Sequence, residues 1–150
     1  MNEKEGSGDY RFLSQCACLN MRRANRAVTQ FYDHALKSVG IKVTQFSILA
    51  VLANTKETTL ADLASVLGMD RTTLTRGLQR LENEKLVVSR HGEDARERWI
   101  QLTQRGYAVL NSAIPLWQQA QSVIEDGFEA QFSDFLRMLS TSRQLASTGT

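Results

Sequence analysis

Residues 59–84, TLADLASVLGMDRTTLTRGLQRLENE, carry the pattern that decides the fold. Thr59 opens a stretch of capping-box form, with Asp in the place of Glu, and predicts a short helix that stops at Gly68. Asp70 is placed to cap a second helix, Arg71 to about Glu84, whose leucines repeat at helical spacing and face a core. A short helix, a glycine turn and a second capped helix together predict a helix-turn-helix.

A β-hairpin is expected directly after this unit. Beyond Lys85 the period of the apolar residues changes from helical to alternating. Residues 86–88 and 99–102 have the pattern of strands, and the polar segment 91–95 lies between them. The order of helix, turn, helix and hairpin predicts a winged helix-turn-helix.

Further helices are expected on both sides of this lobe. Residues 10–39 contain neither Gly nor Pro and predict one long amphipathic helix that ends at Gly40. Thr44 is placed to cap an apolar, buried helix that closes at Asn54 and Thr55.

On the C-terminal side, Thr103 is placed to cap a helix that runs to about Asp126. Pro115 is expected to interrupt and kink this helix, and Gly127 to end it. A last amphipathic helix follows, and its polar tail after about Ser142 is expected to fray.

The composition fits one mainly helical domain. The chain has 150 residues, of which 42% are hydrophobic, so it can bury a core without disulfides or a structural metal. Residues 1–9 are polar with no apolar stretch, which predicts neither a secretory signal nor a membrane span and places the chain in the cytoplasm. A net charge of +2 is too small to indicate a nucleic-acid partner by itself.

One face of the Asp70-capped helix carries residue types that read DNA. At about 100° per residue, the side chains opposite the leucines are Thr72, Arg76, Gln79 and Asn83. Arg can pair with guanine, Gln with adenine, and Thr with phosphate or a thymine methyl group. The candidate DNA contacts on this helix are Arg71, Thr72, Thr73, Thr75, Arg76 and Gln79. An ordinary solvated face is the alternative, but the turn before this helix and the hairpin after it favour DNA binding.

Three arginines surround the predicted hairpin loop: Arg90, Arg96 and Arg98. The loop is long enough to put a guanidinium into the minor groove beside the reading helix, where A-T-rich DNA concentrates negative potential. Asp94 is a further candidate, because an ion pair with Arg96 would hold the shape of the loop; a plain surface pair is the alternative.

The segment 94–106, DARERWIQLTQRG, contains Asp-x-Arg followed by Leu-Thr-x-x-Gly. This pattern resembles the wing signature of the MarR family of winged helix-turn-helix transcription regulators. Residues 60–82 resemble the helix-turn-helix of that family, and residues 26–46 match parts of its first two helices. The resemblance covers about residues 12 to 140. Ala95 departs from it, since many relatives carry a second Arg there, and this implies a wing that holds DNA less tightly.

The resemblance implies a mainly α fold with a small β-hairpin wing, a winged helix-turn-helix domain flanked by N- and C-terminal dimerisation helices. Within one domain, 1–150, the DNA-binding lobe would span about 41–103 and the dimerisation helices about 10–39 and 104–141. It also implies a homodimer on palindromic double-stranded DNA, most often as a repressor, with half-sites about one helical turn apart. Apolar stripes that a lone lobe could not bury are consistent with a dimer.

The resemblance further implies release by a small phenolic or aromatic effector or by oxidation of a cysteine. Cys18 lies eight residues before Arg26, a spacing that resembles the reactive cysteine of organic-hydroperoxide sensors, and Cys16 is its neighbour. On one helix these two side chains would point about 200° apart, so the hypothesis is a sulfenic acid or an intersubunit bridge, with plain packing as the alternative. The candidates for a ligand pocket, with core packing as their alternative role, are Phe12, Tyr32 and Trp117.

An enzyme is not predicted. The sequence shows no nucleophile with a base, no pair of acids and no metal-ligand spacing around His34 and His91, so neither a catalytic residue, a cofactor nor a metal is expected. The rival function is a winged-helix module that binds protein and not DNA. Binding through several phosphate contacts weakens steeply as salt rises, which separates the two functions.

Overall fold

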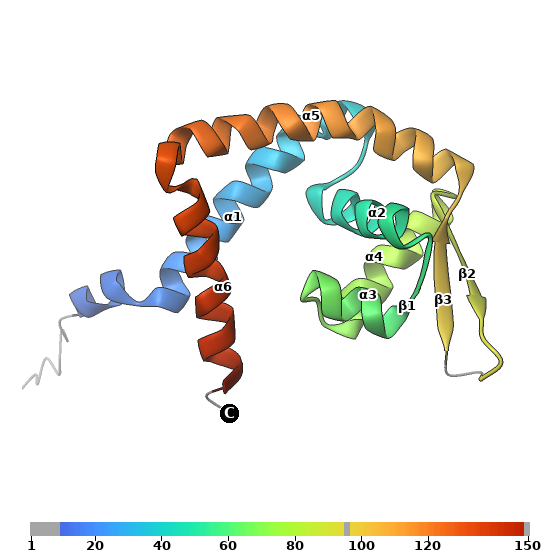
Figure 1. The fold of residues 1–150 in the computed structure, drawn as a ribbon, viewed down its shortest axis with the longest axis horizontal. Coiled ribbons are helices and arrows are strands. Elements are labelled where there is room, and N and C mark those ends of the chain that lie inside the picture. Colours follow the sequence, from blue (N-terminus) through green and yellow to red (C-terminus); the bar gives the residue numbers. More distant parts are fainter. Residues whose placement is uncertain (1–9, 95–96, 149–150) are drawn as a thin grey trace, which may run out of the picture.

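One long helix spans the molecule, and two groups of elements lie on the same side of it, one near each end (Figure 1). The computed structural model describes residues 10–94 and 97–148. Helix α5 (Gln104–Phe128) arches across the top of Figure 1. One group is a lobe of α2 (Val43–Thr55), β1 (Glu57–Thr59), α3 (Leu60–Leu67), α4 (Arg71–Asn83), β2 (Val87–His91) and β3 (Arg98–Leu102). The other contains the short 3-10 helix η1 (Tyr10–Gln15), α1 (Ala17–Ala35) and α6 (Phe132–Thr148), with η2 (Lys37–Val39) and η3 (Glu129–Gln131) as connections.

The core of the lobe forms where α2, α3, α4, the sheet and the first half of α5 meet. Helix α2 is apolar on nearly every side, and its innermost side chains, at most 1% exposed, are Ile48, Leu49 and Leu52. Helix α4 adds the predicted leucine stripe, which is fully buried and consists of Leu74, Leu78 and Leu81. Burying one such side chain stabilises the fold by roughly 1.5–3 kcal/mol. This packing turns the opposite, polar face of α4 towards solvent.

Side-chain caps set the two helices of the helix-turn-helix. The Thr59 hydroxyl oxygen accepts a hydrogen bond from the backbone N–H of Asp62 at 3.1 Å. Helix α3 ends at Gly68, whose φ of 62° is left-handed. Asp70 accepts hydrogen bonds from the hydroxyl of Thr73 at 2.6 Å and from its backbone N–H at 2.8 Å. These donors lower the pKa of the Asp70 carboxyl. The predicted caps and turn are confirmed.

The wing belongs to a three-stranded antiparallel sheet with the strand order β1-β3-β2. Strands β2 and β3 form the predicted hairpin, in which His91 pairs with Arg98. Strand β1, which was not predicted, pairs with the other edge of β3 and places Glu57 opposite Gln101. A strand of three residues is too short to show an alternating pattern in the sequence.

The N-terminal helix is shorter than predicted. In place of one helix over residues 10–39, the chain forms η1, α1 and η2. The first break lies at Cys16, whose ψ of 113° is extended. The Asn20 amide bridges this break by donating to the carbonyl oxygens of Ser14 and Cys16 at 2.8 and 2.9 Å. The prediction of a continuous helix was wrong because an Asn side chain can satisfy carbonyl groups that a break leaves free. Gly40 ends the segment as predicted, with a φ of 75°.

Helix α2 begins earlier than predicted. Thr44 lies inside the helix, and Lys42 occupies the N-cap position. The backbone N–H of Lys42 donates to Oε1 of Gln45 at 2.9 Å, and that of Val43 donates to Oδ1 of Asp33 at 2.8 Å. The prediction of Thr44 as the cap was wrong because a carboxylate from α1 satisfies the helix end, and local sequence does not show such a contact.

Helix α5 begins at the predicted cap and continues through its proline. The Thr103 hydroxyl oxygen accepts a hydrogen bond from the backbone N–H of Gly106 at 3.0 Å. The helix passes Pro115 without the predicted interruption and remains one element. Ala113 and Ala120, on either side of the proline, are buried at 0% and 4% exposure, so both halves of the helix are packed against the rest of the protein.

The corner between α5 and α6 lies beyond Gly127, which was predicted to end α5. The helix continues to Phe128, and the chain turns at the next residue, whose φ is 51°. The Phe128 and Phe135 rings stack at this corner with 4.2 Å between their centroids. The segment after Ser142, predicted to fray, is helical as far as Thr148. Its Arg, Gln, Leu and Ala residues are good helix formers.

The terminal helices bury few of their own side chains. Helix α6 has no buried residue, and α1 has only Tyr32. Their large exposed apolar side chains include Met21, Val28, Phe31, Leu136, Met138, Leu139 and Leu145. Within the described ranges, every helix is too short or too polar to cross a membrane.

Candidate nucleic-acid interface

The solvent-facing side of α4 carries every residue that was predicted to contact DNA from this helix. With the leucine stripe in the core, the exposed side chains are Arg71, Thr72, Thr73, Thr75, Arg76 and Gln79. The β2–β3 hairpin projects from the same lobe beside the helix-turn-helix (Figure 1). The lobe therefore presents a polar helix face and an adjacent β ribbon together.

The hydrogen bonds on this face show which donors are available. The Thr73 hydroxyl donates to Asp70, and the Thr75 hydroxyl donates to the backbone carbonyl one turn earlier at 2.7 Å. The Gln79 amide donates to Oδ1 of Asn83 at 3.3 Å. Three side chains on this face make no hydrogen bond or ion pair within the part of the chain that the structure describes: Arg71, Thr72 and Arg76. These three side chains can bind a ligand without breaking an existing contact.

Side chains on the inner face of the hairpin tie it to the end of α4. Nη2 of Arg98 lies 2.7 Å from Oε1 of Glu82, and Nε of Arg98 donates to Oγ of Ser89 at 3.1 Å. The Ser89 hydroxyl donates to the same Glu82 oxygen. The side chains of Arg98 and Glu82 are only 24% and 20% exposed. Arg98, which was predicted to contact DNA, therefore binds a carboxylate of α4 in the free protein.

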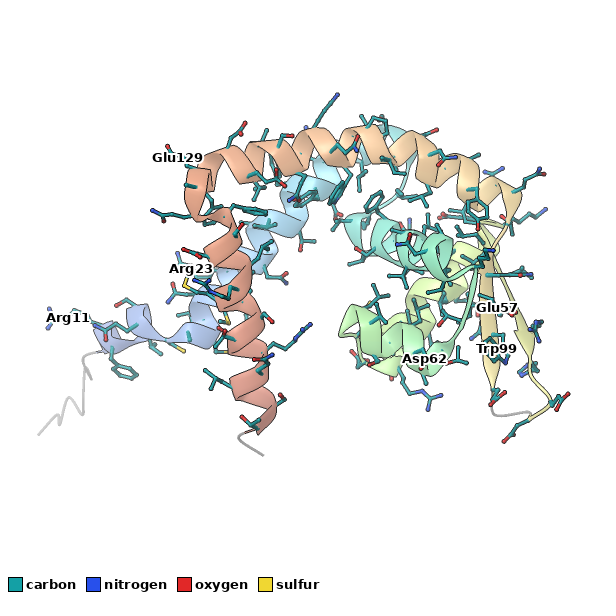
Figure 2. All side chains as sticks on the ribbon, in the orientation of Figure 1. Arg11, Arg23, Glu57, Asp62, Trp99 and Glu129 are labelled. Atoms are coloured by element: carbon teal, nitrogen blue, oxygen red, sulfur yellow. The ribbon has the colours of Figure 1, made fainter. Side chains whose placement is uncertain are left out.

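The outer face of the hairpin is tied to β1. Nη2 of Arg90 lies 2.7 Å from Oε1 of Glu57, and the guanidinium carbon lies 5.7 Å from the centre of the Trp99 ring. Figure 2 shows Glu57 and Trp99 on the neighbouring strands β1 and β3. The pair is 58% and 32% exposed, so it adds at most about 1 kcal/mol of stability. Its effect is to orient Arg90 along the sheet.

The tip of the wing lies outside the described residues. Arg96, the predicted minor-groove residue, and its neighbour Ala95 belong to this gap. Beside it, the backbone N–H of Gly92 donates to the carbonyl of Glu97, and that of Glu97 to the carbonyl of Asp94, both at 2.9 Å. These bonds hold the two ends of the loop together. The ion pair between Asp94 and Arg96 stays a prediction.

Comparisons with known proteins agree with this geometry. A profile described as the MarR family matches residues 39–97. The crystal structure of the M. tuberculosis transcriptional regulator MosR in complex with DNA is 38% identical to this chain, with a TM-score of 0.82. The match covers 89% of this chain and 97% of that one. This chain belongs to the MarR family.

Two curated relatives of this MarR-family chain are regulators as well. The HTH-type transcriptional regulator SarZ of Staphylococcus epidermidis is 25% identical over 125 residues, covering 83% of this chain and 77% of SarZ. The organic hydroperoxide resistance transcriptional regulator of Bacillus subtilis is 27% identical over 113 residues, covering 75% of this chain and 77% of the relative. The chain is a transcriptional regulator and not an enzyme, and the predicted family and fold are confirmed.

The two cysteines of this MarR-family regulator lie at the start of α1. Cys18 is exposed in the first turn, and Cys16 is half-buried; both are free thiols. Cys16 is the N-cap residue, with an extended backbone, and is not part of the helix. The argument that a helical rotation separates the two side chains was therefore wrong. Across residues 10–94 and 97–148, no three His, Cys, Asp or Glu side chains are grouped to hold a metal ion.

The three aromatic candidates for a ligand pocket lie in three different environments. Phe12 lies in η1 and is 65% exposed. Tyr32 is buried, and its hydroxyl donates to Oε1 of Gln121 on α5. Trp117, on α5, stacks on Phe46 of α2 with 5.6 Å between ring centroids. Tyr32 and Trp117 thus join α1 and α2 to α5, and a ligand pocket around these residues stays a prediction.

Sequence reasoning missed the acceptors that hold the wing: Glu57, Glu82 and Ser89. The alternation of side chains along a strand could have pointed to Ser89, because Ser89 and Arg98 fall on the same face of the hairpin as the buried Ile100. Polar groups on an inward face need partners. No signal was available for Glu57, because its strand was not recognisable.

The Glu82 carboxyl makes the stability of the lobe depend on pH. Burial of the Glu82 carboxyl acts to raise its pKa. Hydrogen bonds from Ser89 and Arg98, together with the charge of Arg98, outweigh burial, so the pKa lies below its ordinary value of 4.5. The charged carboxylate is therefore favoured by the folded state. Its contribution to stability is complete above pH 4.5 and is lost as the pH falls through the lowered pKa.

We expect the Glu82→Gln variant to be less stable than the wild type at about pH 7, with a smaller gap at about pH 3. The variant lacks the titrating group, so only the wild type loses this contribution on acidification. Urea unfolding of both proteins at the two pH values measures the gap. A gap that does not change between them would contradict the assigned direction of the pKa shift.

Proposed function

We propose that this MarR-family regulator binds double-stranded DNA in a sequence-specific way, with the exposed face of α4 in the major groove. The observation that carries the proposal is the free state of Arg71, Thr72 and Arg76 on a helix whose other face is fixed in the core. MosR, whose structure contains DNA, supports it by its 38% identity. DNA-binding regulators act where the genome lies, so we assign the protein to the cytoplasm.

The residues have different roles in this proposal. Arg76 and Gln79 read base edges, because Arg matches guanine and Gln matches adenine. Arg71, Thr72, Thr73 and Thr75 contact phosphates or thymine methyl groups near the start of the helix. Arg96 at the wing tip enters the minor groove, as the resemblance implies.

We propose further that the regulator is a homodimer on a palindromic site, with about 41–103 as the DNA-binding lobe and the terminal helices as the interface. Helix α6, without a buried residue of its own, supports this assignment. An apolar hollow of about 760 Å³ separates α6 from α1 and is lined by Met21, Leu139 and Leu145. Contiguous apolar surface of this kind indicates a partner, and a second copy supplies matching helices.

The direction of control in this proposal is repression, released by a cysteine oxidant or a small aromatic ligand. Cys18 lines the hollow between α1 and α6, so oxidising its thiol adds polar oxygen to the proposed dimer interface. The relative from Bacillus subtilis, named for organic hydroperoxide resistance, supports the oxidant route. For the ligand route, the proposed pocket residues are Phe12, Tyr32 and Trp117.

Selection of bound duplexes from a random pool, followed by a salt titration, tests this function. We expect an inverted repeat and an affinity that falls about 10³- to 10⁵-fold between about 50 and about 200 mM salt, for six to ten phosphate contacts. Adding a hydroperoxide should release the wild type but not a Cys16→Ser, Cys18→Ser double variant. No enriched sequence, together with a salt-insensitive protein partner, would favour the rival function of a winged-helix protein-interaction module.

A further inference from the structure

We propose that Arg98 is a positioning residue that ties the wing to the reading helix through Glu82 and Ser89, and that it does not contact DNA. This inference rests on the proposed DNA-binding function and adds to it a device that fixes the angle between two DNA-binding elements. We call the contact among these three side chains the wing strap.

The backbone joins α4 to the wing only at the base of the hairpin. Between them lies a tight turn at Lys85, whose φ of 59° is left-handed. The turn is closed by hydrogen bonds from the N–H of Lys85 to the carbonyl of Glu82 at 2.9 Å and from the N–H of Leu86 to the carbonyl of Leu81 at 2.8 Å. Beyond Leu86, the described residues of the hairpin make no backbone hydrogen bond to α4. Strand β1 anchors β3 to the lobe as far as Trp99, so side chains must set the tilt of the hairpin beyond that point relative to α4.

The wing strap spans all three elements concerned. Glu82 belongs to the last turns of α4, Ser89 to β2 and Arg98 to β3. One oxygen of the Glu82 carboxylate receives a donor from each strand, Nη2 of Arg98 at 2.7 Å and the hydroxyl of Ser89. Arg98 also donates through Nε to Ser89 at 3.1 Å. The planar guanidinium fixes the direction of these donors, and the pair is mostly shielded from water.

Arg98 differs in this respect from Arg76. Arg76 is exposed and makes no hydrogen bond or ion pair within the described residues, so it can bind DNA without giving up such a contact. To bind a phosphate through the same donors, Arg98 would have to leave Glu82. The partly buried Glu82 carboxylate would then lose its charged partner, which is unfavourable. The geometry therefore assigns Arg98 to a contact within the protein.

The tilt of the hairpin matters because the helix and the wing must meet neighbouring grooves together. From Ser89 to the loop at Asp94 the ribbon is roughly 16 Å long, at about 3.3 Å per residue. A tilt of about 10° then moves the tip by about 3 Å, which is the length of a hydrogen bond. A wing without the strap spends less time in the position that matches the bound DNA, and affinity falls without the loss of any DNA contact.

The test compares Arg98→Gln, Glu82→Gln and the double variant on the selected operator. We expect each single variant to lose about tenfold in affinity and the double variant to lose no more than either one, since both break the same strap. The slope of log affinity against log salt should stay at the wild-type value. Additive losses, or a slope reduced by about 0.9 for Arg98→Gln, would mean that Arg98 contacts a phosphate and would overturn the proposal.

Two further variants sharpen the result. Arg98→Lys keeps the charge but not the two directed donors, so we expect it to behave like Arg98→Gln; a residue that only neutralises a phosphate would tolerate Lys. Lys37→Gln removes one exposed charge from η2, which packs on α5 and not on the wing, and should leave affinity unchanged.

A measurement without DNA separates this inference from the proposed function. Trp99 is the neighbour of Arg98 on β3, and a Trp117→Phe background leaves it as the single tryptophan, since the chain has two. In that background, Arg98→Gln and Glu82→Gln should lower the fluorescence anisotropy of Trp99 by freeing the wing. Unchanged anisotropy in the free protein overturns the strap, whereas a wild type that binds no DNA defeats only the proposed function.

Discussion

Gly106→Ala is expected to lower the free energy of unfolding by more than about 3 kcal/mol, because it pushes the start of α5 away from the turn before the wing. A Cβ at this position would lie 2.1 Å from the carbonyl oxygen of Leu86 and 3.1 Å from its carbonyl carbon. Both are backbone atoms and cannot rotate away. The same Leu86 oxygen accepts hydrogen bonds from the N–H and the hydroxyl of Thr103, each at 3.1 Å, so moving it also disrupts the cap of α5.

Thermal and urea unfolding measure this effect, and a lower melting temperature by roughly 6–12 °C or more is expected. Gly127→Ala is the matched control, since Gly127 lies in the same helix with no atom within 4 Å of the added Cβ. There alanine should raise the stability by up to about 1 kcal/mol through its better helix propensity. If Gly106→Ala proves as stable as the wild type, the close approach of α5 to Leu86 does not exist in solution.

Arg76→Ala is expected to reduce operator affinity more than any other single change on α4. A guanidinium that binds a guanine in two places contributes about 1–3 kcal/mol of discrimination. A dimer on a palindrome loses this contribution in both half-sites, so the fall is roughly 30-fold to 10⁴-fold. Arg76 is exposed and makes no hydrogen bond or ion pair within the described part of the protein, so its removal should leave stability almost unchanged.

Binding measured on the operator and on single-base variants of it checks this prediction. If Arg76 reads a base, the variant loses preference at one position of each half-site; if it binds phosphate, affinity falls equally on all sequences. Lys37→Ala, which removes an exposed charge from η2, is the control for net charge. Full affinity of Arg76→Ala for the operator would show that α4 does not read DNA through this side chain.

Much of the lobe was predictable because short-range chemistry decides it. Thr59, Asp70 and Thr103 each cap a helix with a partner three residues later, and Gly68 occupies a left-handed position that favours glycine. Such contacts lie within one turn of helix and are visible in any local stretch of sequence. The exposed face of α4 followed directly, once its leucines were assigned to the core.

The rest depends on contacts between distant parts of the chain. Asp33 caps α2 from another helix, and Glu57 reaches Arg90 from a strand too short to recognise. The pairing of Arg98 with Glu82 depends on how the hairpin folds back on α4. The sequence proposed Arg90 and Arg98 as DNA contacts, and only the fold shows that each of them pairs with a carboxylate of the protein, Glu57 and Glu82.

Helix α5 is one long, continuous helix that joins the lobe to the terminal helices. Its 25 residues make a rod of roughly 37 Å. Leu110 and Ala113 are seated in the lobe, whereas Ala120 is packed further along towards the terminal helices. A swing of about 10° at one end displaces the other by about 6 Å, half the width of a major groove at about 12 Å. If the protein binds DNA as proposed, a modest rearrangement among the terminal helices would thus be enough to move α4 out of register with the major groove.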